Sequence, residues 1–137
     1  MQKVADLSNE QMGEDLPLDF LAECFKQTFI EIEVLKNERG LEDPSVHNMV
    51  ITDGTRLIAT RYSTQPENDS RTLYFAKGKK YVCHGNQCHM IAQDGKPGSI
   101  LVVSEKLDEF VEEWIPIPDN HALLVEKDLS YKTFSLT

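Results

Sequence analysis

The hydrophobic period of this sequence changes once, near residue 40, and that change limits the possible fold classes. Before it, apolar residues recur at the spacing of one helix face, at Leu18, Leu21, Ala22, Phe25, Phe29 and Ile32. After it, apolar residues fall in short runs separated by turn residues, which is the pattern of strands. One helix followed by many strands lacks a regular βαβ alternation, so it predicts an α+β protein with a mostly antiparallel sheet.

The helix is expected to run from Leu18 to Lys36. Asp15 and the early Pro17 suit its start, because proline is tolerated in the first turn. The segment ending at Gly40 supplies a stop, since glycine commonly follows the last helical turn.

Strands are expected over most of the remaining chain. The clearest hairpin turns at Asp53-Gly54, a dipeptide that suits a tight turn, between strands at 49–52 and 56–62. Residues 99–104 form an apolar run, which predicts a central strand buried on both faces and a second layer to cover it. Further strands are expected at 72–75, 81–83, 88–92, 122–125 and 131–134, the last two joined by a turn at Lys127-Asp128.

The size and charge of the chain narrow its class. Its 137 residues suit one domain, for which we expect residues 1–15 to be a mobile acidic lead-in and residues 16–137 to form the folded part. The formal net charge of -9 opposes binding to nucleic acid or to anionic lipid surfaces. No apolar run reaches the roughly 18 to 20 residues that span a bilayer, so no membrane role is expected.

The N-terminal residues and the number of cysteines suggest a cellular location. The first fifteen residues are polar and acidic, without the basic start and apolar stretch of a secretory signal. Three cysteines are an odd number, which does not give a closed disulfide framework and favours a reducing compartment. A cytoplasmic protein with free thiols is therefore expected, with Cys24 beside the apolar face of the helix.

One cluster contains residue types that bind metal. Two Cys-His pairs flank a short turn, at Cys83, His84, Cys88 and His89. Thiolates and imidazoles are the ligands that zinc prefers, although structural sites usually combine two separated pairs. The alternatives are a small zinc-binding module and a hairpin turn with half-buried thiols, and the second is favoured.

Several short motifs, taken in order, carry a resemblance to a known family. They are Asn48-Met-Val-Ile-Thr-Asp-Gly54, Leu57-Ile-Ala-Thr-Arg61-Tyr62, Val103-Ser-Glu-Lys-Leu107, Trp114-Ile-Pro-Ile-Pro118 and Ala122-Leu-Leu-Val125. Behind a helix, this order resembles the C-terminal half of type 2 glutamine amidotransferase domains. The members that look most similar are the stand-alone γ-glutamyl hydrolases of glutathione breakdown and ergothioneine synthesis. The resemblance covers roughly residues 16 to 136.

The resemblance implies a fold and a chemistry. The family has the four-layer αββα sandwich of N-terminal-nucleophile hydrolases, so this chain would be an incomplete version of that sandwich. Its members hydrolyse γ-glutamyl amide bonds with an N-terminal cysteine whose free amine manages the proton. This sequence begins Met1-Gln2-Lys3 and has no cysteine before Cys24. We therefore expect no catalytic residue and no cofactor in this chain, and no activity from it alone.

The resemblance also suggests partners and site residues. A missing N-terminal catalytic half or a partner chain would supply the nucleophile, and a γ-glutamyl small molecule would be the substrate of the complete domain. Residues of this chain that match the family motifs and could lie near substrate are Asn48, Asp53, Arg61, Ser104 and Glu105. The alternative is a stand-alone noncatalytic interaction domain, and a homo-oligomer is compatible with either hypothesis.

Overall fold

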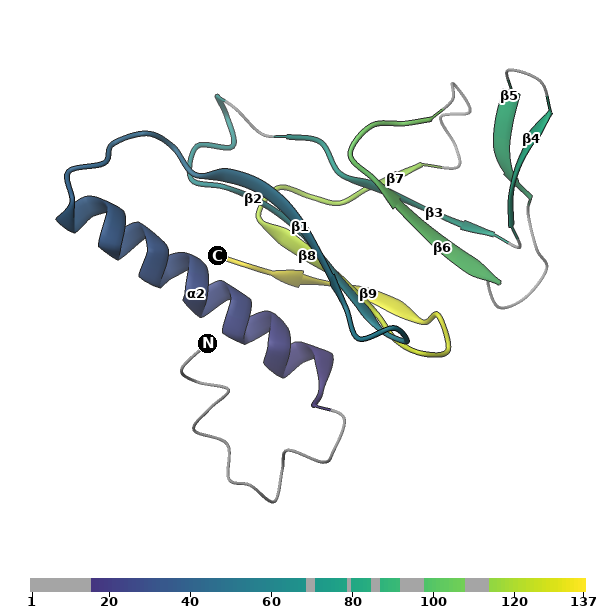
Figure 1. Ribbon diagram of the computed structural model, residues 1–137, viewed down its shortest axis with the longest axis horizontal. Helices are drawn as coiled ribbons and strands as arrows, with labels where there is room; N and C mark the ends of the chain where they lie inside the picture. The colour runs from purple at the N-terminus through teal and green to yellow at the C-terminus, as the bar shows by residue number, and fades with distance from the viewer. Residues whose placement is uncertain (1–15, 69–70, 79, 85–86, 92–97, 108–113) are drawn as a thin grey trace.

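The protein was analysed as a computed structural model that describes residues 16–68, 71–78, 80–84, 87–91, 98–107 and 114–137. The expected lead-in, residues 1–15, lies outside the described residues. The described elements, shown in Figure 1, are α2 (Leu18–Glu38), β1 (Val46–Thr52), β2 (Leu57–Ser63), β3 (Tyr74–Gly78), β4 (Lys80–His84), β5 (Gln87–Ile91), β6 (Ser99–Val103), β7 (Ile115–Pro116), β8 (His121–Val125) and β9 (Tyr131–Ser135). One long helix followed by antiparallel strands confirms the expected α+β class.

The predicted helix is present and ends two residues later than expected. Pro17 occupies its N-cap position, and the Pro17 carbonyl accepts a hydrogen bond from the Leu21 N–H at 3.2 Å. At the other end, Gly40 has a φ of 67°, a left-handed conformation that glycine adopts without a steric penalty. The Leu41 N–H then donates to the Lys36 carbonyl at 3.0 Å, so the last turn is closed as in many helix C-termini.

The strands form two larger antiparallel sheets and one separate hairpin. The first sheet has the order β1-β2-β8-β9, the second has the order β6-β3-β7, and β4 pairs with β5. The predicted hairpin is confirmed: β1 and β2 pair from Val46↔Ser63 to Thr52↔Leu57 around Asp53 and Gly54. The last predicted hairpin is β8–β9, where the Glu126 N–H donates to the Ser130 carbonyl.

Alternation along β2 and β8 builds two cores on opposite faces of the first sheet. Ile58 and Leu124 face α2 and pack with Phe29, which is 2% exposed. Their neighbours Ala59 and Leu123 face the second sheet. The side chains completing that inter-sheet core are Leu73, Phe75, Ile117 and Val125. The layers therefore follow the order helix, sheet, sheet, with α2 along one side of the first sheet (Figure 1).

The position predicted for strand 99–104 is wrong. This strand is β6, which lies at an edge of the second sheet and pairs only with β3 among the described strands. Its apolar residues are half-buried on both faces, because Ile100 and Val102 face the inter-sheet core while Leu101 and Val103 pack beside Trp114. An edge strand with apolar contacts on both faces therefore has the same apolar run as a central strand.

The expectation of free thiols holds for one cysteine and is wrong for another. Cys24 on α2 is free and half-buried. Cys83 on β4 is disulfide-bonded, and its Cα partner across the β4–β5 ladder is Cys88. The described part of the chain contains no helical segment with the length and apolar character needed to cross a lipid bilayer.

Candidate functional site

A polar cavity of about 350 Å³ opens between the two sheets, where β1 begins and β6 ends. Its lining residues are Val46, His47, Asn48, Arg71, Thr72, Ser104 and Glu105. Three of the five predicted substrate-adjacent residues, Asn48, Ser104 and Glu105, therefore line one space, although Asn48 lies more than fifty residues before the other two. Pockets that mix neutral and charged polar groups in this way bind small polar molecules.

Two hydrogen bonds hold the three walls of this cavity together. The Asn48 Nδ2 of β1 donates to the Thr72 carbonyl at 2.8 Å, just before β3 begins. The Thr72 Oγ1 in turn donates to the Ser104 carbonyl at 2.7 Å, just after β6 ends. The first of these bonds fixes the Asn48 amide, whose Oδ1 is buried and accepts no hydrogen bond within the described part of the chain. A buried amide oxygen without a donor is unfavourable, so the packing around Asn48 holds this atom at a cost in stability.

An aromatic cluster supports the cavity on the side of α2. The His47 ring lies 4.9 Å from Phe29 in an edge-on arrangement and 5.1 Å from Tyr62. Burial lowers the pKa of His47 below its usual value of 6.5, and the Lys36 charge adds to this while the Glu33 charge opposes it. Burial and the Glu33 charge raise the pKa of Tyr62. The imidazole is therefore neutral at pH 7 and offers one donor and one acceptor.

Two exposed side chains of opposite charge, Arg71 and Glu105, complete the lining. They provide a cation for a carboxylate and an anion for an ammonium group. Ser104 is also exposed, and its hydroxyl makes no hydrogen bond to a residue that the structure describes. The described lining contains no cysteine and shows no base paired with this hydroxyl, so the arrangement can bind and orient a small molecule but shows no activated nucleophile.

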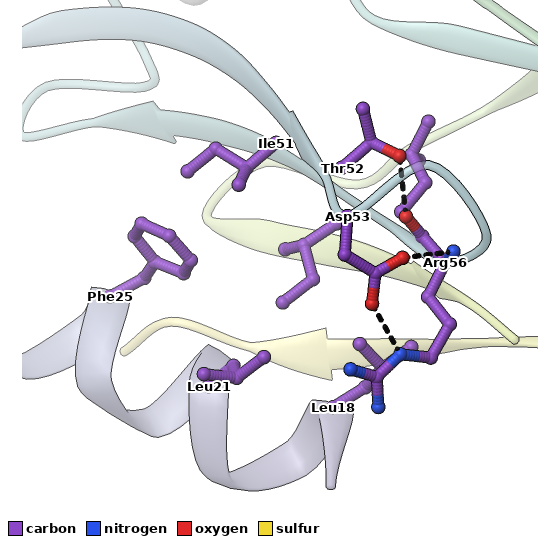
Figure 2. A pocket seen from close by; sticks show the side chains of 9 residues that line it. Leu18, Leu21, Phe25, Ile51, Thr52, Asp53 and Arg56 are labelled. Carbon is purple, nitrogen blue, oxygen red and sulfur yellow. Dashed lines mark hydrogen bonds and ion pairs between the residues drawn. The ribbon is translucent and has the colours of Figure 1, made fainter. Parts of the chain in front are cut away.

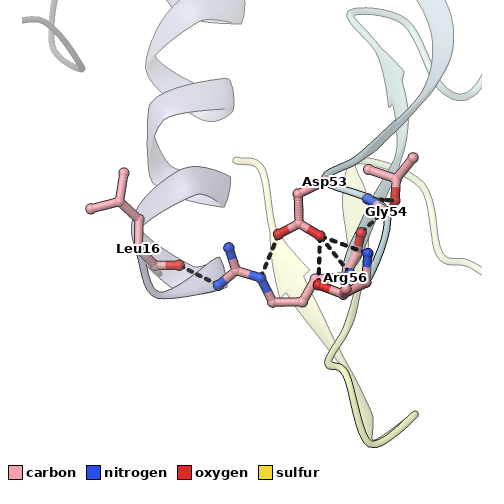
Figure 3. A network of polar contacts seen from close by, with 6 residues as sticks. Leu16, Asp53, Gly54 and Arg56 are labelled. Carbon is pink, nitrogen blue, oxygen red and sulfur yellow. Dashed lines mark hydrogen bonds and ion pairs between the residues drawn. The ribbon is translucent and has the colours of Figure 1, made fainter. Parts of the chain in front are cut away.

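Asp53, the fourth predicted residue, lies away from the polar cavity at the tip of the β1–β2 hairpin. Its Oδ1 accepts hydrogen bonds from the backbone N–H groups of Thr55 and Arg56, and its Oδ2 accepts one from the Arg56 Nε at 2.7 Å (Figure 3). The bond from the Arg56 backbone, followed by the others, holds the pKa of Asp53 well below its usual value. The Arg56 Nη1 also donates to the Leu16 carbonyl, so Asp53 ties the hairpin to the start of α2.

A second cavity of about 170 Å³ lies beside this hairpin and is mainly apolar. Leu18, Leu21 and Phe25 of α2 border it on one side, while Ile51 and Asp53 border it on the other (Figure 2). The Asp53 carboxylate is fully hydrogen-bonded within the turn, so it is not available to act on a ligand in this cavity. The cavity is suited to apolar side chains.

Arg61, the fifth predicted residue, connects layers behind the polar cavity. It is the Cα partner of Asn48 across the β1–β2 ladder. Its Nε donates to the Arg71 carbonyl at 2.8 Å, its Nη1 donates to the Ile117 carbonyl at 2.7 Å, and its Nη2 lies 2.8 Å from the Asp119 Oδ1. Arg61 therefore supports the cavity by holding the Arg71 segment in place, and it does not line the cavity itself.

The zinc hypothesis stays a prediction. Among its four residues only Cys83 has a described side chain, and that cysteine is in a disulfide, a form that cannot bind metal as a thiolate. The side chains of His84, Cys88 and His89 lie outside the described ones. Within the described residues no group of three or more His, Cys, Asp or Glu side chains is placed to hold a metal ion.

Sequence reasoning missed His47, Arg71 and Thr72. His47 and Asn48 both precede the strand predicted at 49–52, and only Asn48 belongs to one of the motifs that predicted site residues. Arg71 and Thr72 lie in the segment that leads into β3, where Thr72 was expected to begin the strand, and connecting segments are a common place for site residues. No local signal predicted that this segment would meet the end of β6, because the contact joins segments 32 residues apart.

The protein belongs to the α+β class and has two packed antiparallel sheets with a polar cavity between them. Its sequence is similar to that of a glutamine amidotransferase. The relative is the probable glutamine amidotransferase DUG3 of Saccharomyces cerevisiae, which is 29% identical over 96 residues. This match covers 69% of the chain and 27% of the relative, so the chain spans about a quarter of that protein's length. No known family profile matches the chain, and no solved structure matches it.

Proposed function

We propose that this chain is the C-terminal scaffold of a glutamine amidotransferase type 2-like domain, whose nucleophile is supplied by another segment or another chain. The observation that carries the proposal is the sequence similarity to a glutamine amidotransferase over 96 residues. The layered arrangement of α2 and two antiparallel sheets agrees with part of an αββα sandwich. In the complete domain the substrate would be a γ-glutamyl compound.

The polar cavity is the part of this scaffold that we assign to the substrate side. Asn48 lines this cavity, and Arg71 and Glu105 line it with side chains of opposite charge. A γ-glutamyl compound carries an ammonium group, a carboxylate and an amide, and these groups complement that set. Asp53 and Arg61 then serve the scaffold, because both are engaged in structural contacts.

The experiment measures release of p-nitroaniline from γ-glutamyl p-nitroanilide. The chain alone is expected to release none. A mixture with the N-terminal segment of a type 2 glutamine amidotransferase, whose first residue is cysteine, is expected to release product, and replacing that cysteine by serine should abolish release. Asn48→Ala should lower the rate of product release by the mixture. Asn68→Ala, at an exposed position outside the cavity lining, should leave that rate unchanged. Release by the chain alone that disappears in Cys24→Ser would contradict the scaffold role.

A stand-alone interaction domain is the second candidate. It is favoured by two large apolar side chains on an edge strand, Val50 and Ile51, which are 52% and 42% exposed. If the mixture shows neither product release nor complex formation in size-exclusion chromatography, the scaffold proposal fails and this candidate replaces it.

A further inference from the structure

The outer edge of β1 carries backbone groups that no described residue pairs. At one end of the strand the Thr64 N–H donates to the Ser45 carbonyl, and at the other end the Asp53 N–H donates to the Arg56 carbonyl. Hydrogen-bonded pairs alternate along an antiparallel ladder, so the odd-numbered residues of β1 bond to β2. The N–H and C=O groups that point away from β2 belong to Val46, Asn48, Val50 and Thr52.

The composition of β1 leaves this edge without the usual protection against strand pairing. Edge strands are normally blocked by charged residues or proline, and β1, with the sequence VHNMVIT, contains neither. The opposite edge of the same sheet, β9, carries Lys132, whose Nζ lies 2.6 Å from the Asp19 Oδ2. The edge strand β7 of the second sheet carries Pro116. The β1 edge therefore contrasts with the edges formed by β9 and β7, whereas β6, the other edge of the second sheet, also contains neither a charged residue nor proline.

The side chains along β1 also suit an added strand. Val50 and Ile51 are both exposed, and adjacent residues of a strand point to opposite faces. On the helix side, Ile51 borders the apolar cavity together with Leu21 and Phe25 (Figure 2). A segment paired with β1 would thus find backbone partners at the edge and a cavity of about 170 Å³ for apolar side chains beside it.

The charge of the chain decides between possible occupants. A second copy would bring another net charge of -9 to the interface, and such self-repulsion keeps proteins monomeric. A cationic segment would instead be attracted. We propose that the free edge of β1 binds an extended segment of a different polypeptide, with apolar residues at alternate positions and basic residues at its ends. This inference goes beyond the proposed function and does not depend on it.

The test follows backbone amide exchange in the ¹⁵N-labelled full chain by NMR. The probe is a ten-residue peptide of alternating valine and threonine with two lysines at each end. At a free peptide concentration about ten times its dissociation constant, exchange of the Asn48 and Val50 amides should slow roughly tenfold, because exchange then requires release of the peptide. The same peptide with every backbone nitrogen of its valine and threonine residues methylated has no N–H group on either edge, so it cannot pair as a strand and should give no protection. A version with glutamates at its ends should bind more weakly.

Two proline variants locate the binding edge. Val50→Pro removes one outward N–H of β1 and should raise the dissociation constant about tenfold. The matched control is Thr133→Pro on β9. Bonds from Glu126 to Ser130 and from Leu136 to Asn120 fix the β8–β9 ladder, so the Thr133 N–H also points outward. This control should keep the wild-type affinity.

Three results would overturn the proposal. The first is equal affinity of the two proline variants, and the second is protection by the methylated peptide. The third is concentration-dependent protection of Asn48 and Val50 without any peptide, because that would identify a second copy of the chain as the occupant. If Val50→Pro fails to fold, the comparison of the plain and methylated peptides still decides the question.

Discussion

At the scale of single residues, Asp53 shows how a motif residue can serve the fold and not the substrate. Its carboxylate accepts bonds from two backbone N–H groups and from the Arg56 guanidinium. These bonds favour the charged form, so the folded pKa lies below the ordinary value of 3.8. The stability that they contribute is present above that value and is lost as the pH falls through the folded pKa.

We predict that Asp53→Ala lowers the melting temperature at pH 7, because the turn loses its acceptor. Most of this difference should disappear as the pH falls well below 3.8, where the wild-type carboxylate is protonated. Calorimetry at both pH values checks the prediction, with Glu42→Ala, which removes an exposed carboxylate, as the control. If the melting temperatures of the wild type and Asp53→Ala differ by the same amount at both pH values, the charge of Asp53 does not contribute to stability.

His47 should give a dependence of stability on pH with the same sign as Asp53, but at higher pH. Its folded pKa is below 6.5, so the unfolded chain takes up a proton first as the pH falls. Stability therefore decreases as the pH falls from 6.5 towards the folded pKa, and it changes no further from this cause below that value. Urea unfolding at pH 7.5 and pH 5.5 should show a smaller loss of stability in His47→Gln than in the wild type. Equal losses in the two proteins would rule out His47 as the group responsible.

At the scale of elements, Arg61 connects β2 to segments of the second sheet. Its side chain is 15% exposed and bonds to two carbonyls and one carboxylate. We predict that Arg61→Met lowers the free energy of unfolding by about 1 to 3 kcal/mol, because it leaves the part-buried Ile117 carbonyl without its donor and removes two further contacts. The control is Lys132→Met, which breaks the exposed ion pair with Asp19 and should cost under about 1 kcal/mol. Chemical denaturation measures both, and similar losses would contradict the account of Arg61.

The elements also show what sequence can and cannot predict. Periodicity predicted α2 and the β1–β2 hairpin, because both depend on neighbours within a few residues. The edge position of β6 was not predictable, since burial on both faces has the same pattern in a central strand and in a packed edge strand. The motifs predicted Asn48, Ser104 and Glu105 as site residues, but their meeting with Arg71 depends on how the two sheets pack.

At the scale of the whole molecule, the described elements pack on the faces of the two sheets to different extents. The first sheet is packed on both faces, by α2 and by the second sheet. On its outer face, the second sheet has Trp114, which is 3% exposed, and the half-buried Tyr74, Leu101 and Val103. In the proposed domain, another segment would add a layer to this face. The second sheet should therefore be the less stable part of the chain when it is alone.

The most direct test of this account is a thermal melt of the 137-residue chain, followed by circular dichroism and by fluorescence of Trp114, with size-exclusion chromatography alongside. Circular dichroism reports α2 and the strands together, whereas Trp114 reports the outer face of the second sheet. The account predicts a broad melt in which the Trp114 transition comes first, followed by aggregation. Coincident, cooperative transitions of a compact species would contradict it, because they would show a self-sufficient domain that needs no further layer.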